Sequence, residues 1–304
     1  MPDGGVDLVV LGSVNVDHVV LADAFPTPGQ TVRGTGVRSE TGGKGANQAV
    51  AAALAGARVR MVARVGADAE GERARSDLVA RGVDVRGVGT VAAEATGTAW
   101  ITVAQQDNTI VVVAGANGSW PAVLPEVQAS VLLAQLEVPL DVVLRAATAF
   151  TGTFVLNAAP AADLPDALLA RCDVLVVNEH ELSVVARTPA SAHDLDRAHA
   201  ALLGRGVRAV VTTLGQAGAV VTDATGSTRL PAVPAPAVID TTGAGDAFTG
   251  VLAARLAAGD GLASAARWAT VAGSHAVRAA GAQASYLPFA VLEQEVAALH
   301  LETT

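Results

Sequence analysis

Short, valine-rich apolar runs recur along the chain and alternate with longer segments of helical periodicity. The short runs are predicted strands, at residues 7–11, 59–65, 131–135, 154–157, 174–177 and 209–213. Most are followed by a predicted helix, at residues 46–55, 72–81, 140–149 and 179–186. Strands that are apolar throughout are typical of a parallel sheet covered by helices on both faces. We therefore predict an α/β fold, with a doubly wound, mainly parallel sheet flanked by helices.

Two segments interrupt this alternation. Residues 14–41 are extended and rich in turn residues, and they carry no helical pattern. Residues 98–104 and 110–114 flank a polar turn, which is the pattern of a β-hairpin. Together the segments at about 14–41 and 97–114 predict a small β-sheet that stands off the main domain as a lid. The pattern leaves open an ordinary hairpin at the edge of the main sheet.

The last third of the chain predicts another hairpin and then helices. The hairpin strands are at residues 217–222 and 228–233, two long helices follow at 244–258 and 262–279, and a final helix starts after Pro288. No linker rich in proline, serine or charge divides the sequence. We expect residues 1–304 to form a single domain.

Composition narrows the possible partners. The formal net charge is -9, which argues against nucleic acid or an anionic membrane as the main partner. No stretch reaches the roughly 18 apolar residues of a membrane span, and the N-terminus lacks the basic segment of a signal peptide. The single cysteine forbids an internal disulfide. We expect a soluble, cytoplasmic protein.

Residues 239–248 carry the clearest chemical signal. Gly243, Ala244 and Gly245 let the backbone turn tightly just before a predicted helix, whose free N–H groups favour an anion. Asp246 follows within the first helical turn. Phosphoryl transfer needs both a base and donors for the phosphoryl oxygens, so this arrangement suits it. An acidic residue that only stabilises the helix start is the alternative.

Two further segments suit a hydroxyl-rich ligand. Lys44, Asn47 and Gln48 lie on a glycine-rich turn that opens a predicted helix, but the spacing is not that of a phosphate-binding P-loop. Asn15 and Asp17 alternate just past the first strand and so share one face of an extended chain. Ligands of open α/β sheets bind at such strand ends, although single Asn and Asp residues also form turns.

These segments resemble the ribokinase-like (PfkB) carbohydrate kinases over nearly the whole chain. The matching motifs are at residues 12–17, 42–49, 115–117, 135–137, 178–181, 213–215, 240–246, 281–283 and at Ser285. The resemblance implies an ATP-dependent kinase that phosphorylates a primary hydroxyl of a small sugar, with ribose as the first candidate. It also implies a homodimer in which the lids of two subunits pair.

The resemblance assigns roles to individual residues. Asp246 matches the catalytic base, and Gly243, Ala244 and Gly245 match the anion hole for the γ-phosphate. The residues that match sugar-binding positions are Asn15, Asp17, Gly43, Lys44, Asn47, Glu137 and Asp246. Those that match the nucleotide site are Asn178, Thr213, Gly215, Gly218 and Gly245.

Two metal ions are implied as well. Glu181 matches a position that organises Mg²⁺ through water, next to the nucleotide phosphates. A K⁺ site beside the anion hole is matched by the side chains of Asp240 and Ser285 and the backbone carbonyls of Thr242, Ala276, Ala279 and Gly281. The chain departs from the family pattern at Ala279, Ala280, Ala284 and Tyr286.

Alternatives remain at this stage. The substrate is open between ribose, deoxyribose, another pentose and a nucleoside. Asp17 and Lys44 favour a hydroxyl-rich free sugar, because a base or a deoxy carbon would leave them unpaired. A non-catalytic sugar sensor on the same fold is the rival of a different class.

Overall fold

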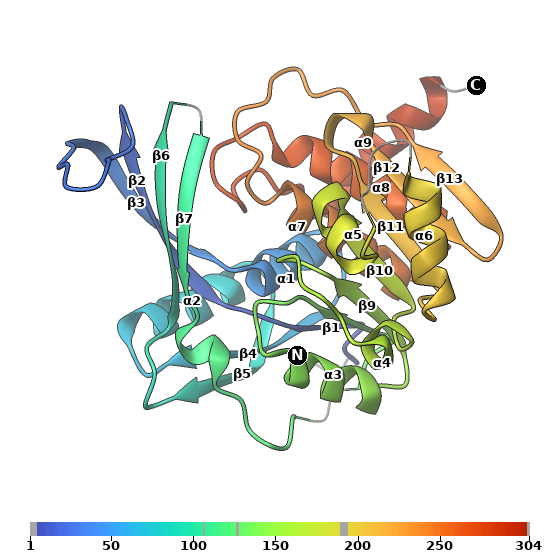
Figure 1. The fold of residues 1–304 in the computed structure, drawn as a ribbon, viewed down its shortest axis with the longest axis horizontal. Coiled ribbons are helices and arrows are strands. Elements are labelled where there is room, and N and C mark those ends of the chain that lie inside the picture. Colours follow the sequence, from blue (N-terminus) through green and yellow to red (C-terminus); the bar gives the residue numbers. More distant parts are fainter. Residues whose placement is uncertain (1–4, 106, 126–127, 189–193, 303–304) are drawn as a thin grey trace.

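The computed structural model describes residues 5–105, 107–125, 128–188 and 194–302 and is built around a nine-stranded sheet (Figure 1). Its strand order is β13-β12-β11-β10-β9-β8-β1-β4-β5. The strands from β11 to β5 all pair in parallel: β1 (Leu8–Leu11), β4 (Val59–Gly66), β5 (Asp84–Val91), β8 (Val131–Ala134), β9 (Thr153–Asn157), β10 (Val174–Asn178) and β11 (Ala209–Thr213). Antiparallel strands β12 (Ala219–Asp223) and β13 (Gly226–Leu230) complete one edge.

Helices cover both faces of this sheet because successive strand residues point to opposite sides. Leu8 and Val10 of β1 pack in one core, whereas Val9 and Leu11 pack in the other. The first core also takes residues from α1 (Lys44–Leu54), α2 (Ala69–Ala80), α7 (Ala244–Ala257), α8 (Leu262–Ala276) and α9 (Phe289–Glu302). The second takes residues from α3 (Leu140–Ala149), α4 (Asp166–Leu169), α5 (Glu179–Val185) and α6 (Leu195–Gly204). The predicted doubly wound α/β fold is confirmed.

A separate four-stranded sheet stands off this body, at the upper left in Figure 1. Its order is β3-β2-β6-β7, from β2 (Asn15–Ala22), β3 (Gly34–Gly42), β6 (Gly97–Ala104) and β7 (Asp107–Val113). The predicted hairpin therefore belongs to a second sheet, and the alternative of an edge hairpin on the main sheet is wrong. Two short 3₁₀ helices, η1 (Gly115–Gly118) and η2 (Gly215–Ala217), lie in connecting loops.

The structure differs from the predicted elements at the end of one helix and at several elements that were not predicted. The helix predicted to run to residue 279 ends at Ala276, because the Val277 carbonyl instead accepts hydrogen bonds from the backbone N–H groups of Ile239 and Asp240. Strand β5 and helices α4 and α6 were not predicted. Among the described residues, no helix is both long and apolar enough to cross a membrane.

The order in which the strands follow one another along the chain identifies the edge of the main sheet where a ligand is expected to bind. β1 pairs with β4 on one side and β8 on the other, so the order of the strands reverses between β1 and β8. Leu11 and Ala134, the last residues of these two strands, are paired. The loops that follow both strands are therefore neighbours at the carboxyl edge, where open α/β sheets bind ligands.

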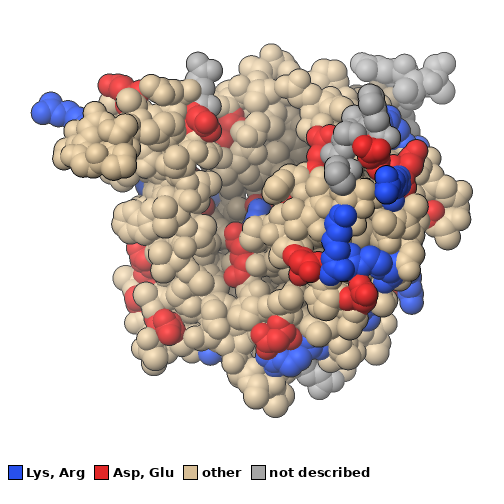
Figure 2. Space-filling model, in the orientation of Figure 1, with Lys and Arg blue, Asp and Glu red and all other residues tan. Residues whose placement is uncertain are grey.

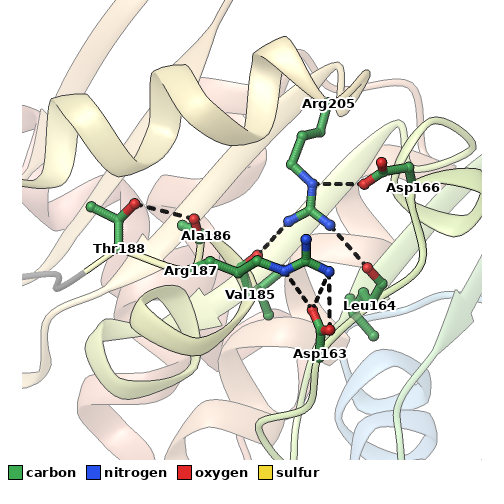
Figure 3. A network of polar contacts seen from close by, with 8 residues as sticks. All are labelled: Asp163, Leu164, Asp166, Val185, Ala186, Arg187, Thr188 and Arg205. Carbon is green, nitrogen blue, oxygen red and sulfur yellow. Dashed lines mark hydrogen bonds and ion pairs between the residues drawn. The ribbon is translucent and has the colours of Figure 1, made fainter.

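Arginines fix the loop that follows β9 at the same edge (Figure 3). Arg205, at the end of α6, donates to the Leu164 carbonyl at 2.9 Å and to Asp166 Oδ1 at 2.8 Å. Arg187, just after α5, pairs with Asp163 at 2.8 Å. These contacts tie the loop to the ends of α5 and α6.

Candidate active site

Helices α1 and α7 bring their first turns together at the carboxyl edge. Each follows a glycine with positive φ, Gly43 at 87° and Gly243 at 79°, a conformation that a side chain would strain. The helices approach closely at Gly250, where an added Cβ would lie 2.4 Å from the Gln48 carbonyl oxygen. This approach sets the first turn of α1 against Asp246, in the first turn of α7.

Asp246 is held by two side-chain amides of α1. Its Oδ2 accepts a hydrogen bond from Asn47 Nδ2 at 3.0 Å, and its Oδ1 accepts one from Gln48 Nε2 at 2.8 Å. The residue is only 8% exposed. It nevertheless lines a cavity of about 230 Å³, so the carboxylate faces an open space next to the free backbone of the helix start.

This cavity gathers many of the predicted residues. Its lining includes Lys44, Asn178, Glu181, Thr213, Gly243, Gly245 and Asp246. A second cavity of about 570 Å³ shares Thr213, Thr241 and Gly245 with it and adds Gly215, Gly218 and a largely apolar wall. The predicted nucleotide residues thus line two cavities that share a border. Figure 2 shows the molecule hollowed between the small sheet and the main body, with acidic and basic side chains at the base of the hollow.

Lys44 supplies positive charge beside Asp246. The nearby Asp246 carboxylate raises the pKa of Lys44, burial opposes this, and Glu137 and Glu181 add to the rise. The ammonium group therefore stays protonated inside the cavity. A fixed cation beside a helix N-terminus suits a ligand that carries phosphate groups.

Glu137 and Asn15 connect the loops after β8 and β1. Glu137 Oε2 accepts hydrogen bonds from Ser13 Oγ at 2.5 Å and from the Lys44 backbone N–H at 2.9 Å. Asn15 Oδ1 accepts one from Asn117 Nδ2 at 2.8 Å. Both predicted sugar residues thus lie at the switch point of the main sheet, where they are fixed by Ser13, Lys44 and Asn117, three residues of the motifs noted in the sequence.

Among the predicted sugar-binding residues, Asp17 has the buried charge that receives the least support from neighbouring hydrogen-bond donors. Its carboxylate lies against Gly42, where an added Cβ would be 2.1 Å from Oδ2. Its Oδ1 is buried and has no hydrogen-bond partner among the described residues. Burial, followed by the charges of Glu137, Glu40 and Asp246, raises the pKa of Asp17 to about 7. A buried acceptor of this kind is costly unless a ligand donates to it.

Asn178 and Glu181 form the N-terminal cap of α5. The Asn178 side chain accepts from the Glu181 N–H at 2.8 Å, and Glu181 Oε2 accepts from the Asn178 N–H at 2.8 Å. Burial raises the pKa of Glu181. Within the described residues no group of three or more His, Cys, Asp or Glu side chains could hold a metal. One carboxylate lining the cavity fits Mg²⁺, which keeps several waters and uses few protein ligands.

The residues predicted for a monovalent cation lie in two facing segments. Asp240 accepts hydrogen bonds from the Thr242 N–H at 2.9 Å and the Gly281 N–H at 3.0 Å, and Ser285 Oγ donates to the Ala276 carbonyl at 2.6 Å. Burial alone would raise the pKa of Asp240, but hydrogen bonds from Gly281 and Thr242, together with the charge of Arg38, outweigh it and hold the pKa below its usual value. One carboxylate with hydroxyl and carbonyl oxygens fits a large, weakly hydrated cation. Ala279 lies in the same segment as Gly281.

Sequence reasoning assigned no role to several polar residues that support the site, although Gln135 and Gln283 lie within the matched motifs. Gln135, Asn157 and Gln283 are buried or partly buried and hydrogen-bond to Gln48 or Asn47. The signal available was an amide placed directly at the end of an apolar strand, as at Asn157 in β9 and Gln135 just after β8. Tyr286, a departure from the family pattern, donates its hydroxyl to the Gly243 carbonyl at 3.0 Å.

The fold and the site define a kinase for a small hydroxyl-bearing substrate. The sequence model of the pfkB family carbohydrate kinases matches residues 6–290, and the chain belongs to this family. The resemblance noted in the sequence is thereby confirmed, and the chain is a carbohydrate kinase.

Individual relatives are similar over nearly their whole length. The chain is 36% identical over 289 residues to the ribokinase of Haemophilus influenzae, which covers 91% of this chain and 94% of that protein. It is 32% identical over 295 residues to the deoxyribokinase of Salmonella typhi, and the match covers 92% of this chain and 95% of that protein. The structure of Arabidopsis thaliana ribokinase complexed with ribose and ATP matches with a TM-score of 0.90 at 29% identity. This match covers 96% of this chain and 99% of that one.

Proposed function

We propose that this carbohydrate kinase transfers the γ-phosphoryl group of ATP to the O5 hydroxyl of D-ribose. One observation carries the proposal: the Asp246 carboxylate, held by Asn47 and Gln48, lines one cavity together with Lys44 and the Gly243–Gly245 turn. The similarity to ribokinases from several organisms supports ribose as the substrate.

Asp246 acts as the general base in this proposal. It accepts the proton of the sugar hydroxyl as the oxygen attacks the γ-phosphorus, and the leaving group is ADP. The N–H groups of Gly243, Ala244 and Gly245 receive the oxygens of the transferring group, since the first N–H groups of a helix have no intrahelical partner. The Ala244 N–H would give up its 3.3 Å hydrogen bond to the Thr241 carbonyl to do so. Lys44 adds positive charge to the same cavity.

The sugar lies between the small sheet and the main body. Its hydroxyls are bound by Asn15, Asp17, Gly43, Lys44, Asn47 and Glu137. The unpartnered Oδ1 of Asp17 supports this placement, because a sugar hydroxyl would supply the missing donor.

ATP occupies the two adjoining cavities, with its phosphates near Asn178 and Gly245 and its base near Thr213, Gly215 and Gly218. Glu181 would hold Mg²⁺ through water, and this ion would neutralise part of the phosphate charge. Asp240, Ser285 and the carbonyls of Thr242, Ala276, Ala279 and Gly281 would hold K⁺ next to the anion hole. A cytoplasmic location would supply the ATP that this reaction needs.

The small sheet is proposed as a lid that also forms a homodimer, within a single domain of residues 1–304. It exposes large apolar side chains: Val37 (77%), Trp100 (54%), Ile110 (51%), Val111 (64%), Val112 (54%) and Val113 (52%). β7 lies at the edge of the sheet, and an exposed apolar edge strand readily pairs with another chain. A second subunit with the same sheet would cover this surface.

Phosphorylation of deoxyribose is the second candidate, favoured by the similarity to a deoxyribokinase. ADP release should be measured with ribose, 2-deoxyribose, other pentoses and a nucleoside, with and without K⁺. The proposal expects the highest kcat/KM for ribose. Equal or better use of 2-deoxyribose would favour the second candidate, and sugar binding without ADP release would identify a sensor.

The cation site is tested by Asp240→Ala. Loss of this carboxylate removes the only charged group proposed to bind K⁺, so we expect K⁺ activation of ADP release to disappear while the residual rate without K⁺ stays similar. If the variant keeps the K⁺ dependence of the wild type, the ion binds elsewhere.

A further inference from the structure

We propose that Gln48 and Asn157 are positioning residues that present a fixed N–H donor to Asp246 and so keep the base aimed into the cavity. The inference rests on the proposed function, because it concerns the base of that reaction. Gln48 is fully buried, so solvent does not compete for its hydrogen bonds, whereas Asn157 is 7% exposed and lines the same cavity as Asp246.

The orientation of both amides follows from one backbone carbonyl. The Val176 carbonyl can only accept, so Asn157 must turn its NH₂ group towards it, and this hydrogen bond is 3.1 Å long. Asn157 Oδ1 then faces Gln48 and must accept, from Gln48 Nε2 at 2.9 Å. The second hydrogen of Gln48 Nε2 is thereby directed at Asp246 Oδ1.

The other end of the Gln48 amide agrees with this assignment. Gln48 Oε1 accepts a hydrogen bond from Gln135 Nε2 at 2.7 Å. A flipped Gln48 amide would place oxygen against the oxygens of Asn157 and Asp246 and nitrogen against nitrogen of Gln135. The Gln48 amide therefore has one orientation compatible with its neighbours.

A second series of hydrogen-bonded amides fixes the donor to the other oxygen of Asp246, Oδ2, in the same way. Gln283 Nε2 donates to the Thr41 carbonyl at 3.0 Å and to Asn47 Oδ1 at 2.9 Å, which turns Asn47 Nδ2 towards Asp246 Oδ2. Each oxygen of Asp246 thus receives a donor whose direction is set by a backbone carbonyl. Asp246 also lines the cavity, so its remaining lone pairs are available to a ligand there.

Two effects on catalysis follow. Donors to a carboxylate favour its charged form, and they do so more strongly in a buried site. A fixed carboxylate also needs no reorientation when the sugar hydroxyl arrives. The charged and titratable groups that influence Asp246 are Lys44 from α1, Asp17 from β2, Glu181 from α5 and Tyr286 after α8. A neutral substitution at Gln48 leaves all four in place.

The test is the pH profile of kcat in Gln48→Met, which keeps the size of the side chain and removes the donor. We expect kcat at neutral pH to fall by about 10-fold or more and the acidic limb of the profile to move up by about 1 to 2 pH units, since a hydrogen bond to a charged group has that strength. KM for ribose and ATP should change little.

Gln135→Met is the matched control. It removes an equally buried amide but leaves Gln48 hydrogen-bonded to both Asn157 and Asp246, so its acidic limb should coincide with that of the wild type. If Gln48→Met does not fold, Gln48→Glu keeps the shape and places an acidic group beside Asp246, so it should move the limb up further.

Unchanged acidic limbs in the folded Gln48 variants would overturn the inference, as would an equal shift in Gln135→Met. Asp246→Asn distinguishes a failure of the positioning role of Gln48 from a failure of the assignment of Asp246 as the base. If that variant is inactive while the Gln48 profiles match the wild type, only the positioning role fails; if it is active, the base assignment itself fails.

Discussion

Asp17 carries the least compensated charge of the candidate site. Its Oδ1 is buried without a partner in the described part of the chain, and burial next to Glu137, Glu40 and Asp246 raises its pKa to about 7. Near neutral pH the free protein therefore contains both forms of this carboxyl group. A sugar that donates hydroxyls to Asp17 would favour the ionised form.

Ribose affinity should consequently depend on pH. We expect the dissociation constant to decrease as the pH rises towards about 7 and to level off above it, because only the ionised carboxylate accepts at both oxygens. Titration calorimetry across this range measures the effect. Asp17→Asn should bind ribose more weakly and without this dependence; the same pH dependence in both proteins would contradict the role of Asp17.

The stability of the sugar-free protein should depend on pH in the opposite sense: it decreases where ribose affinity increases. The folded pKa of Asp17, about 7, lies above the unfolded value of 3.8, so its contribution to stability is complete below 3.8 and is lost as the pH rises through 7.

Individual site residues were predictable where the sequence kept them close together. The turn at Gly243–Gly245 and Asp246 are neighbours in the chain, and so are Lys44 and Asn47. The support of the base was not predictable in the same way. Gln48 and Asp246 are 198 residues apart, and Gln48 and Asn157 are 109 residues apart. Only the packing of α1 against α7 and the sheet brings them together.

At the scale of elements, the site depends on how α7 begins. Gly243 holds φ at 79°, and its carbonyl accepts both the Ala247 N–H, at 2.8 Å, and the Tyr286 hydroxyl, at 3.0 Å. Burial, and then the charge of Asp246, raise the pKa of Tyr286, so the phenol remains a donor. Tyr286 thereby ties the proposed anion hole to the segment that carries the proposed K⁺ ligands.

Tyr286→Phe should loosen this turn. Loss of one net hydrogen bond of about 1 kcal/mol predicts that kcat falls by about 5-fold while KM for ribose is nearly unchanged. Steady-state ADP release measures both constants. Gly243→Ala is the more severe comparison, because its Cβ would lie 2.7 Å from Ala282 Cα. A Tyr286→Phe enzyme with wild-type kcat would show that the phenol does not order the anion hole.

Periodicity predicted the buried elements better than the exposed ones. β11 (Ala209–Thr213) and α3 (Leu140–Ala149) match their predicted bounds, because their apolar residues carry the pattern. β5 was missed, since this edge strand interleaves Asp84, Arg86 and two glycines with its valines. The overextension of α8 has a tertiary cause, since Val277 leaves the helix to pair with residues 239–240.

At the scale of the whole molecule, the small sheet was the ambiguous feature. Its central pair, β2 with β6, is parallel and joins Asn15 to Gly97, so its formation depends on contacts that no local pattern records. The sequence identified both contributing segments but not their pairing. The resulting sheet exposes an apolar surface that a second subunit would cover.

Trp100→Glu tests the proposed dimer. Trp100 is 54% exposed on β6, and a charge there should convert a dimer to a monomer in sedimentation or light-scattering measurements. Val79→Glu, at a 57% exposed position on α2 outside the small sheet, should leave the assembly unchanged. A wild-type protein that stays monomeric at high concentration would contradict the proposal.

The most direct measurement for the whole account is ADP release by Asp246→Asn with saturating ribose, ATP, Mg²⁺ and K⁺. Asn keeps the shape of the side chain but cannot take the proton, so turnover should fall by roughly 10²- to 10⁴-fold while ribose affinity is nearly unchanged. A variant that retains half of the wild-type turnover would contradict the assignment of Asp246 as the base.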